Sequence, residues 1–439
     1  METPCVEVKH QEMVPTPVPT STPTPAKPTD YTKNSVEPDR RMAWVVTVKE
    51  LVPIPNALNV ELAKLVENEW QCIVKKADFK VGDLGIYFTV DSVLDPENKN
   101  SAFLKGAKLK TKKILNTLSQ GLLAPLAWVV DYGTDPSSLK VDDDVTKLLR
   151  VRKFVHSAEL HEYSGEGKGR LPWPVFLKKT DEERVQNCPT VLAELVGEEV
   201  VITQKRDGTS TTFAWLLKGA YDAGTHAGID AVSHVGADVG TDAGTDAGKG
   251  THHPQCCCDD KQGKARCRCR HIPRYGTFLV CGRNHILVPD HEDAKKGNVH
   301  YFAMATRYNL HVAMQKLGSN LGIQGETVGP KINGNRMMLT ELDFEVFNIW
   351  DVDSQSYLPW SRVVDLTTKL KLKTVPVVWQ GVFTKEMASF EFLQKLASEQ
   401  EYAPGVPAEG IVVKSAGGNE KPRHSFKVIS NVYLLKHSL

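Results

Sequence analysis

Short apolar runs separated by polar turns fill the chain from about residue 42 onward. The first runs are rich in β-branched and aromatic residues: Trp44-Val-Val-Thr-Val-Lys, Trp70-Gln-Cys-Ile-Val-Lys and Leu84-Gly-Ile-Tyr-Phe-Thr-Val. That composition is typical of strands, and the Pro, Gly, Asn and Asp residues between the runs favour turns. Several short strands within about 90 residues predict a small β-barrel, for which the OB fold is the commonest choice. We therefore expect an OB-type domain over residues 41–150.

Two segments lack this apolar pattern. Residues 1–40 are rich in Pro and Thr and nearly free of large apolar groups, which predicts a disordered tether or, alternatively, a ligand for a proline-reading domain. A polar connector over 151–169 leads into a second domain over 170–439, which a low-complexity insert at 219–273 interrupts. The second half of the insert holds five cysteines with three nearby histidines, His252, His253 and His271, but the adjacent cysteines do not match the paired spacing of a closed zinc site. We expect a surface loop, with a soft-metal site as the alternative.

Composition narrows the class of protein. Hydrophobic residues make up 41% of the 439 and charged residues 24%, as in globular proteins. The sequence contains no uninterrupted apolar stretch of about 18 residues, the length that a membrane span requires. The first residues lack a secretory signal, and nine cysteines then indicate free thiols. We expect a soluble, intracellular monomer with no membrane partner. The sequence does not distinguish cytoplasm from nucleus.

A net charge of only +1 means that any nucleic-acid binding must come from local basic patches. The clearest patch is a run of five lysines near the end of the predicted barrel: Lys105, Lys108, Lys110, Lys112 and Lys113. Two interpretations stay open, a solvated surface or a track for a phosphate backbone.

The sharpest local signal is Val200-Val-Ile-Thr-Gln-Lys205-Arg-Asp207-Gly208, in which a β-branched strand runs into Lys-x-Asp-Gly. Alone this pattern is weak, because it arises by chance in about one chain in ten. Further motifs follow it in order: Cys281-Gly-Arg283-Asn284, Ile323-Gln-Gly-Glu326, Phe344-Glu-Val-Phe347, Ala408-Glu409-Gly410-Ile-Val-Val-Lys414 and Ser425-Phe-Lys427.

This ordered set resembles the six signature motifs of the covalent nucleotidyltransferases, which are DNA ligases, RNA ligases and mRNA capping enzymes. The closest likeness is to RNA ligases of the family 5 type, in which an OB domain precedes the nucleotidyltransferase domain. Residues 171–176 and 179–187, with Arg184, resemble that family's lead-in to the nucleophile strand. The likeness covers residues 42–436 without the insert. It implies an α+β protein: an OB-type β-barrel followed by an ATP-grasp-like ligase domain of antiparallel sheets flanked by helices.

The resemblance also implies roles. Lys205 would be the nucleophile that carries AMP, and the cations Lys427 and Arg283 would assist it at the phosphates. A free lysine has a pKa of about 10.4, and this pKa must fall to near 7 before the amine can attack, which costs roughly 4–5 kcal/mol. The positive charge of a bound cation lowers the pKa in this way. Carboxylates suit Mg²⁺ or Mn²⁺ as ligands. The metal ligands that the resemblance implies are Asp207, Glu326 and Glu409, partly through bridging water. The nucleotide would contact Thr203, Gln204, Arg283, Glu326, Phe347, Lys414 and Lys427.

The resemblance implies that Phe347 stacks on adenine. Strand alternation puts residues 344 and 347 on opposite faces, so only one of them can line the nucleotide pocket and we expect Phe344 to lie in the core. Two departures from the family pattern are present. Only Lys427 stands between Ser425 and Ser430, where many ligases have two lysines, so Lys414 is a candidate for the second charge. Thr203-Gln204 replaces an acidic residue, which leaves backbone carbonyls to contact the adenine amino group.

The predicted activity is ATP-dependent RNA ligation of 3′-hydroxyl and 5′-phosphate ends, at nicks in an RNA duplex or an RNA/DNA hybrid. Arg184, Lys110, Lys112 and Lys113 are the predicted RNA contacts. One alternative is an mRNA guanylyltransferase, although its OB domain normally follows the catalytic domain. The other is an inactive nucleic-acid-binding protein, which would be expected to lack the lysine or the carboxylates.

Overall fold

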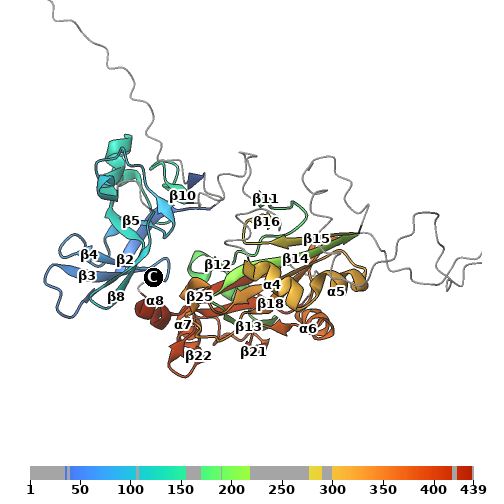
Figure 1. Cartoon of the computed structure of the whole chain (residues 1–439). Helices are drawn as coiled ribbons and strands as arrows, with labels where there is room; N and C mark the ends of the chain where they lie inside the picture. Colours follow the sequence, from blue (N-terminus) through green and yellow to red (C-terminus); the bar gives the residue numbers. More distant parts are fainter. Residues whose placement is uncertain are drawn as a thin grey trace, which may run out of the picture.

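The computed structural model describes residues 35–36, 40–104, 108–154, 170–188, 190–217, 276–288, 299–417 and 423–437 (Figure 1). Most of the predicted tail, most of the predicted connector, the whole predicted insert and Lys105 lie outside the described residues. None of the helices in the described part of the chain combines the length and hydropathy that a membrane span requires.

The N-terminal domain is built on a five-stranded antiparallel sheet in the order β4-β3-β2-β5-β9. Its strands are β2 (Ala43–Pro53), β3 (Val60–Leu65), β4 (Gln71–Lys75), β5 (Leu84–Phe88) and β9 (Leu122–Pro125). The first half of strand β2 is buried on both faces because its residues alternate between two cores. Trp44 packs edge-on against Tyr87 in one core, and Val45 packs with Ile86 in the other.

Shorter elements complete this domain. They are the strands β1 (Ser35–Val36), β6 (Ser92–Val93) and β10 (Arg152–Phe154), the hairpin β7 (Thr111–Ile114) and β8 (Thr117–Gln120), and the 3₁₀ turns η2 (Ala102–Leu104), η3 (Leu126–Tyr132) and η4 (Pro136–Ser138). Strand β10 pairs with both β1 and β6. It therefore ties segments of the predicted tail and connector to the domain, because ladder bonds satisfy their backbone groups.

Two mostly antiparallel sheets form the C-terminal domain. The larger follows the order β11-β16-β15-β14-β17-β18-β19, with β20 beside β18, and the smaller follows β12-β25-β24-β13-β21. The strands of the larger sheet are β11 (Arg170–Pro172), β14 (Thr209–Leu217), β15 (Gly276–Cys281), β16 (His285–Leu287), β17 (Leu321–Val328), β18 (Asp343–Asp351), β19 (Ser356–Tyr357) and β20 (Lys373–Thr374). Those of the smaller sheet are β12 (Glu183–Arg184), β13 (Glu199–Lys205), β21 (Val377–Val382), β24 (Gly410–Ser415) and β25 (Ser425–Ile429). A separate hairpin joins β22 (Glu401–Ala403) to β23 (Val406–Pro407).

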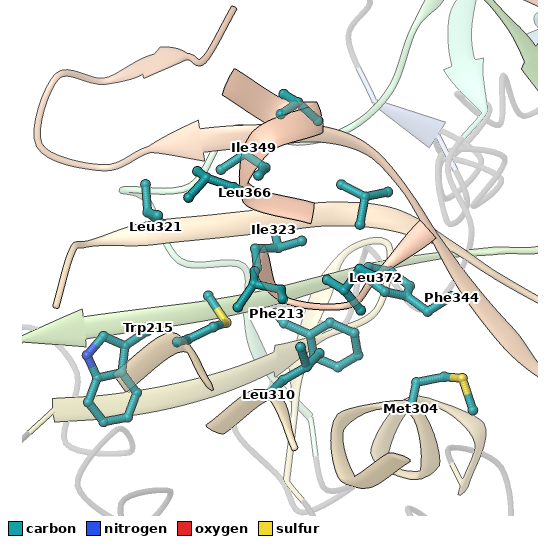
Figure 2. Packing of buried hydrophobic residues seen from close by; sticks show 14 of the residues in the cluster. Phe213, Trp215, Met304, Leu310, Leu321, Ile323, Phe344, Ile349, Leu366 and Leu372 are labelled. Carbon is teal, nitrogen blue, oxygen red and sulfur yellow. The ribbon is translucent and has the colours of Figure 1, made fainter. Parts of the chain in front are cut away.

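Helices cover these sheets, as the predicted α+β class requires. They are α2 (Val191–Glu194), α4 (Val299–Arg307), α5 (Leu310–Leu317), α6 (Trp360–Lys369), α7 (Phe390–Ser398) and α8 (Asn431–His437), with 3₁₀ turns η6 (Val185–Asn187) and η8 (Asn333–Asn335). In the largest core, Phe213 of β14 packs edge-on against Phe344, beside Ile323 of β17 and Leu310 of α5 (Figure 2). A second core joins α7 to β13, β24 and β25.

The two domains touch through the C-terminal helix. Leu118 of β8 packs with Ile429 and Leu434, and the Lys113 ammonium donates a hydrogen bond to the Leu435 carbonyl at 2.9 Å. The hairpin β7–β8 is therefore fastened to the last helix of the ligase-like domain (Figure 1).

Candidate active site

A cavity of about 350 Å³ opens where β13 of the smaller sheet crosses to β14 of the larger one. All ten residues predicted to handle the nucleotide and metal line it: Thr203, Gln204, Lys205, Asp207, Arg283, Glu326, Phe347, Glu409, Lys414 and Lys427. The crossing needs Gly208, because a Cβ there would lie 2.3 Å from the Thr327 carbonyl oxygen and 2.7 Å from Glu326 Cγ. The Lys-x-Asp-Gly motif therefore forms the tight connection between the two sheets.

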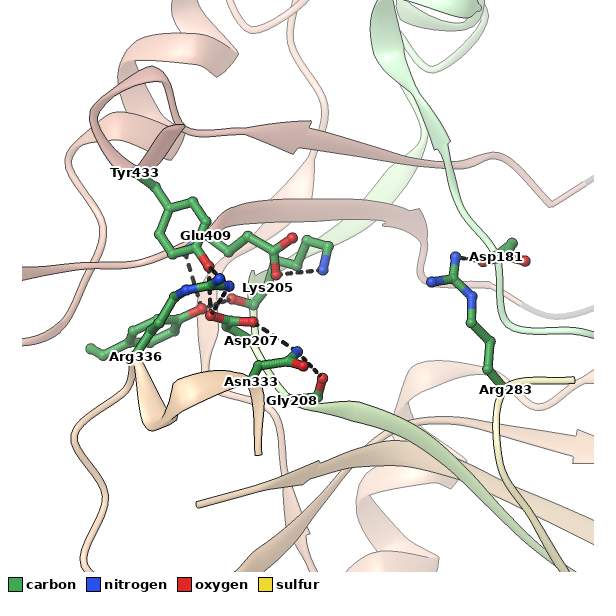
Figure 3. A network of polar contacts seen from close by, with 10 residues as sticks. Asp181, Lys205, Asp207, Gly208, Arg283, Asn333, Arg336, Glu409 and Tyr433 are labelled. Carbon is green, nitrogen blue, oxygen red and sulfur yellow. Dashed lines mark hydrogen bonds and ion pairs between the residues drawn. The ribbon is translucent and has the colours of Figure 1, made fainter. Parts of the chain in front are cut away.

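Lys205 ends β13, and its ammonium lies 2.7 Å from Glu409 Oε2 (Figure 3). Both side chains are about three-quarters buried. Burial lowers the pKa of Lys205, but Glu409 and then Glu326 and Asp207 outweigh burial and raise it above its ordinary value. Without a competing cation, the lysine is therefore charged and cannot act as a nucleophile.

Glu326 of β17 stands near this pair. Burial raises the pKa of its carboxyl to about 8, Lys205 opposes the shift, and the negative charge of Glu409 adds to it. Two carboxyl groups therefore lie beside one ammonium. This donor set fits a hard divalent cation.

Asp207 differs from the other two predicted metal ligands, because its two oxygens already accept hydrogen bonds (Figure 3). Asn333 Nδ2 bonds Oδ1 at 3.1 Å, Arg336 Nη1 lies 3.3 Å from Oδ2, and the Tyr433 phenol also donates to Oδ2. Among the described residues, no three His, Cys, Asp or Glu side chains lie close enough to share one ion. A divalent cation would therefore reach part of this carboxylate set through water.

Two further lysines, the buried Lys414 and the half-buried Lys427, line the cavity. Burial, and then the charges of Lys205 and Arg184, lower the pKa of Lys427 to about 8. Burial and Arg423 lower the pKa of Lys414 to about 7, and its ammonium bonds the Phe347 carbonyl at 2.9 Å and Asn348 Oδ1 at 3.2 Å. Basic side chains whose charge is only partly balanced by nearby carboxylates favour the binding of an anion such as a phosphate.

The aromatic residues of β18 lie as the alternation predicts. Phe344 is fully buried in the largest core, whereas Phe347 is half-buried and lines the cavity, 5.2 Å from the Lys414 ammonium. Arg283 forms an ion pair with Asp181, and both side chains are more than half exposed. The cavity thus offers an aromatic wall, several carboxylates and five basic side chains.

The four predicted RNA contacts lie outside this cavity. Arg184 is placed over the ring of Trp70 in the barrel domain, 5.7 Å from its centroid, and Lys113 is bound to Leu435. Both therefore serve the contact between domains. Lys110 and Lys112 are exposed near the start of β7 and remain available to a ligand.

Motif comparison missed several residues that hold the site together. Arg206 forms a buried ion pair with Glu345 at 2.7 Å. Arg336 and Tyr433 bond Asp207, and Tyr402 bonds the Lys205 carbonyl. Arg206 carried a usable signal, because a charged residue directly after Lys205 in the nucleophile motif also lines the cavity. The two tyrosines carried no such signal.

Comparison with known proteins identifies relatives of both domains. An RNA ligase family model matches residues 198–429, and an OB-fold domain model matches residues 42–126, which confirms the predicted fold class. Naegleria gruberi RNA ligase, solved as a lysine mutant with ATP and Mn, is 27% identical with a TM-score of 0.60, over 90% of this chain and 99% of that one.

Two further structures of the same Naegleria gruberi ligase agree. A mutant with AMP and Mn is 27% identical with a TM-score of 0.61, and the enzyme with pyrophosphate is 28% identical with a TM-score of 0.60. Each alignment covers 91% of this chain and 99% of that one. No curated protein matches the chain. With an RNA ligase model spanning more than half of its length and an OB-fold domain ahead of it, this chain belongs to the RNA ligase family.

Proposed function

We propose that this protein is an ATP-dependent RNA ligase that joins 3′-hydroxyl to 5′-phosphate ends through a covalent Lys205–AMP intermediate. The observation that carries the proposal is the pairing of Lys205 with Glu409 at 2.7 Å in a cavity that also presents Lys427 and Phe347. The similar Naegleria gruberi structures contain ATP, AMP and Mn, which supports the choice of nucleotide and metal.

In the first step, the Lys205 amine attacks the α-phosphorus of ATP and pyrophosphate leaves. The lysine must first give up a proton, for which the Glu409 carboxylate, 2.7 Å away, is the acceptor. Lys427 neutralises the charge that develops on the α-phosphate, and Arg283 contacts the ribose and phosphates. Phe347 stacks on the adenine, which orients the phosphates toward the lysine.

Glu326 and Glu409, with Asp207 reached through water, are the residues that would hold Mg²⁺ or Mn²⁺. Burial, with a smaller contribution from the charge of Glu409, raises the pKa of Glu326, and a bound cation would favour its ionised form. When bound, the ion supplies positive charge that lowers the pKa of the lysine and neutralises the phosphates.

The later steps use the same residues. A 5′-phosphate oxygen of the RNA takes AMP from Lys205, and the lysine amine leaves. The 3′-hydroxyl then attacks the 5′-phosphate, and AMP leaves. One site can perform all three displacements because each needs mainly alignment and charge neutralisation at phosphorus.

The RNA substrate is proposed to be a nicked duplex or an RNA/DNA hybrid bound by a monomer. Lys110 and Lys112, exposed on the barrel domain, would contact its phosphates. Arg184 and Lys113 would act indirectly, by fastening the barrel domain to the ligase domain.

Incubation with α-labelled ATP or GTP and a divalent cation tests the proposal. We expect label on the protein from ATP alone, and none in Lys205→Ala or Lys205→Arg, because arginine keeps the charge but cannot deprotonate. Label from GTP would instead identify a guanylyltransferase. Substantial labelling of either Lys205 variant would refute the mechanism.

A further inference from the structure

Tyr402 belongs to none of the ligase motifs, yet its phenol joins two of them. It lies in β22, and its hydroxyl donates a hydrogen bond to the Lys205 carbonyl oxygen at 2.8 Å. The Tyr402 phenol oxygen in turn accepts a hydrogen bond from the backbone N–H of Glu409 at 3.1 Å. We propose that Tyr402 is a positioning residue, which sets the main chain of the nucleophile and of Glu409 for lysine adenylylation.

The place of these two bonds explains why a side chain is needed there. The ladder between β13 and β24 ends at the pair of Lys205 and Gly410. The Lys205 carbonyl and the Glu409 N–H therefore lie at the end of the ladder, where the chains turn away from each other. An unpaired polar backbone group in a buried place is costly, and the phenol pairs both groups at once.

Tyr402 is itself held firmly. The Arg206 guanidinium lies over its ring, 5.1 Å from the centroid, and Arg206 is fixed by its ion pair with Glu345, in which both side chains are about 90% buried. Gln204 Nε2 donates a hydrogen bond to the carbonyl of Glu401, next to Tyr402, at 3.0 Å. The hairpin that carries Tyr402 is thus attached to the residues on both sides of Lys205, which are Gln204 and Arg206.

The consequence concerns the first step of the proposed function, on which this inference rests. A lysine has a long, flexible side chain, so the position of its main chain limits where its nitrogen can lie. The 2.7 Å contact between Lys205 and Glu409 depends on both main-chain segments. A misplacement of about 1 Å can cost on the order of 100-fold in rate.

The third step differs, because there the 3′-hydroxyl is the attacking group and the lysine amine is not. Loss of the phenol should therefore slow adenylylation of the protein more than sealing of RNA that already carries AMP on its 5′ end. A residue that merely stabilises the fold would affect both steps alike.

The test compares Tyr402→Phe with the unmodified protein and with Tyr87→Phe. Tyr87 is a matched control, since its buried phenol also donates to a backbone carbonyl, that of Gln120 at 2.9 Å, but inside the barrel domain. In Tyr402→Phe, we expect the maximal single-turnover adenylylation rate to fall about 10- to 100-fold. The half-saturating ATP concentration and the sealing of pre-adenylylated RNA should change far less, and Tyr87→Phe should adenylylate at the unmodified rate.

A third variant, with 4-aminophenylalanine at position 402, keeps an N–H donor for the Lys205 carbonyl and should recover most of the adenylylation rate. Unchanged adenylylation in Tyr402→Phe would overturn the inference. Equal losses in adenylylation and in sealing of pre-adenylylated RNA would overturn it as well, as would failure of the aminophenylalanine variant to exceed Tyr402→Phe. Absence of label on the unmodified protein would instead refute the proposed function.

Discussion

Ionised Glu326 should destabilise the folded protein in the absence of ligands, and Glu326→Gln should remove that cost. Burial raises the pKa of this carboxyl from 4.5 to about 8. Because the folded pKa lies above the unfolded value, the folded state binds the proton more tightly. The contribution of Glu326 to stability is therefore fully present below about pH 4.5 and is lost as the pH rises to about 8.

The size of the effect follows from the shift. A difference of about 3.5 units, at 1.36 kcal/mol per unit, corresponds to about 5 kcal/mol above pH 8. The same relation leaves about 3 kcal/mol at pH 7 and about 1 kcal/mol at pH 5. Glu326→Gln should be more stable than the unmodified protein by a margin that grows in this way, while losing adenylylation, as expected of a destabilised active-site charge.

Urea unfolding at unit pH steps from 5 to 9, without nucleotide or divalent cation, measures this margin. Glu69→Gln is the control, because Glu69 is exposed in the barrel domain and its replacement should leave the pH profile unchanged. A margin that stays constant from pH 5 to 9 would refute the argument, as would a Gln variant that is less stable at pH 8.

Two further predictions concern parts of the chain outside the cavity. Lys110→Ala combined with Lys112→Ala should spare adenylylation but weaken RNA binding, with the slope of log affinity against log salt falling by up to about 1.8. Equal loss of adenylylation would show that the barrel domain acts in the first step. Deleting 218–275 and closing with a short Gly-Ser turn should preserve ligation, because Leu217 and Gly276 are paired neighbours in β14 and β15. Loss of ligation in this deletion, together with inhibition of the full chain by zinc chelators, would assign the Cys/His-rich insert a functional metal site.

Much of the site could be predicted from the sequence, because it depends on local order. The family resemblance together with strand alternation separated Phe347, which lines the cavity, from Phe344, which is buried in the core. The motif around Lys205 names its chemistry through residue types a few positions apart. The ordered motifs also predicted that residues as distant as Arg283 and Lys427 would meet at one cavity, which they do.

The sequence was less informative where a charged residue had more than one possible partner. Arg184 and Lys113 belong to basic or family-like segments and were predicted to contact RNA, which stays a prediction; the structure adds that both make contacts between the two domains. A basic side chain binds whichever ring, carbonyl or phosphate lies within reach. That choice depends on how the domains pack, which no local pattern encodes.

Residue types, their order and their strand period thus determined the fold class, the two domains and the groups that gather around Lys205. Only the tertiary structure decided how those groups are held. The Tyr433 bond to Asp207 spans 226 positions of the chain, and the Tyr402 bond to Lys205 spans 197. Such contacts arise when sheet pairing brings distant segments together, and a tyrosine in the sequence gives no sign of which backbone group its phenol will meet.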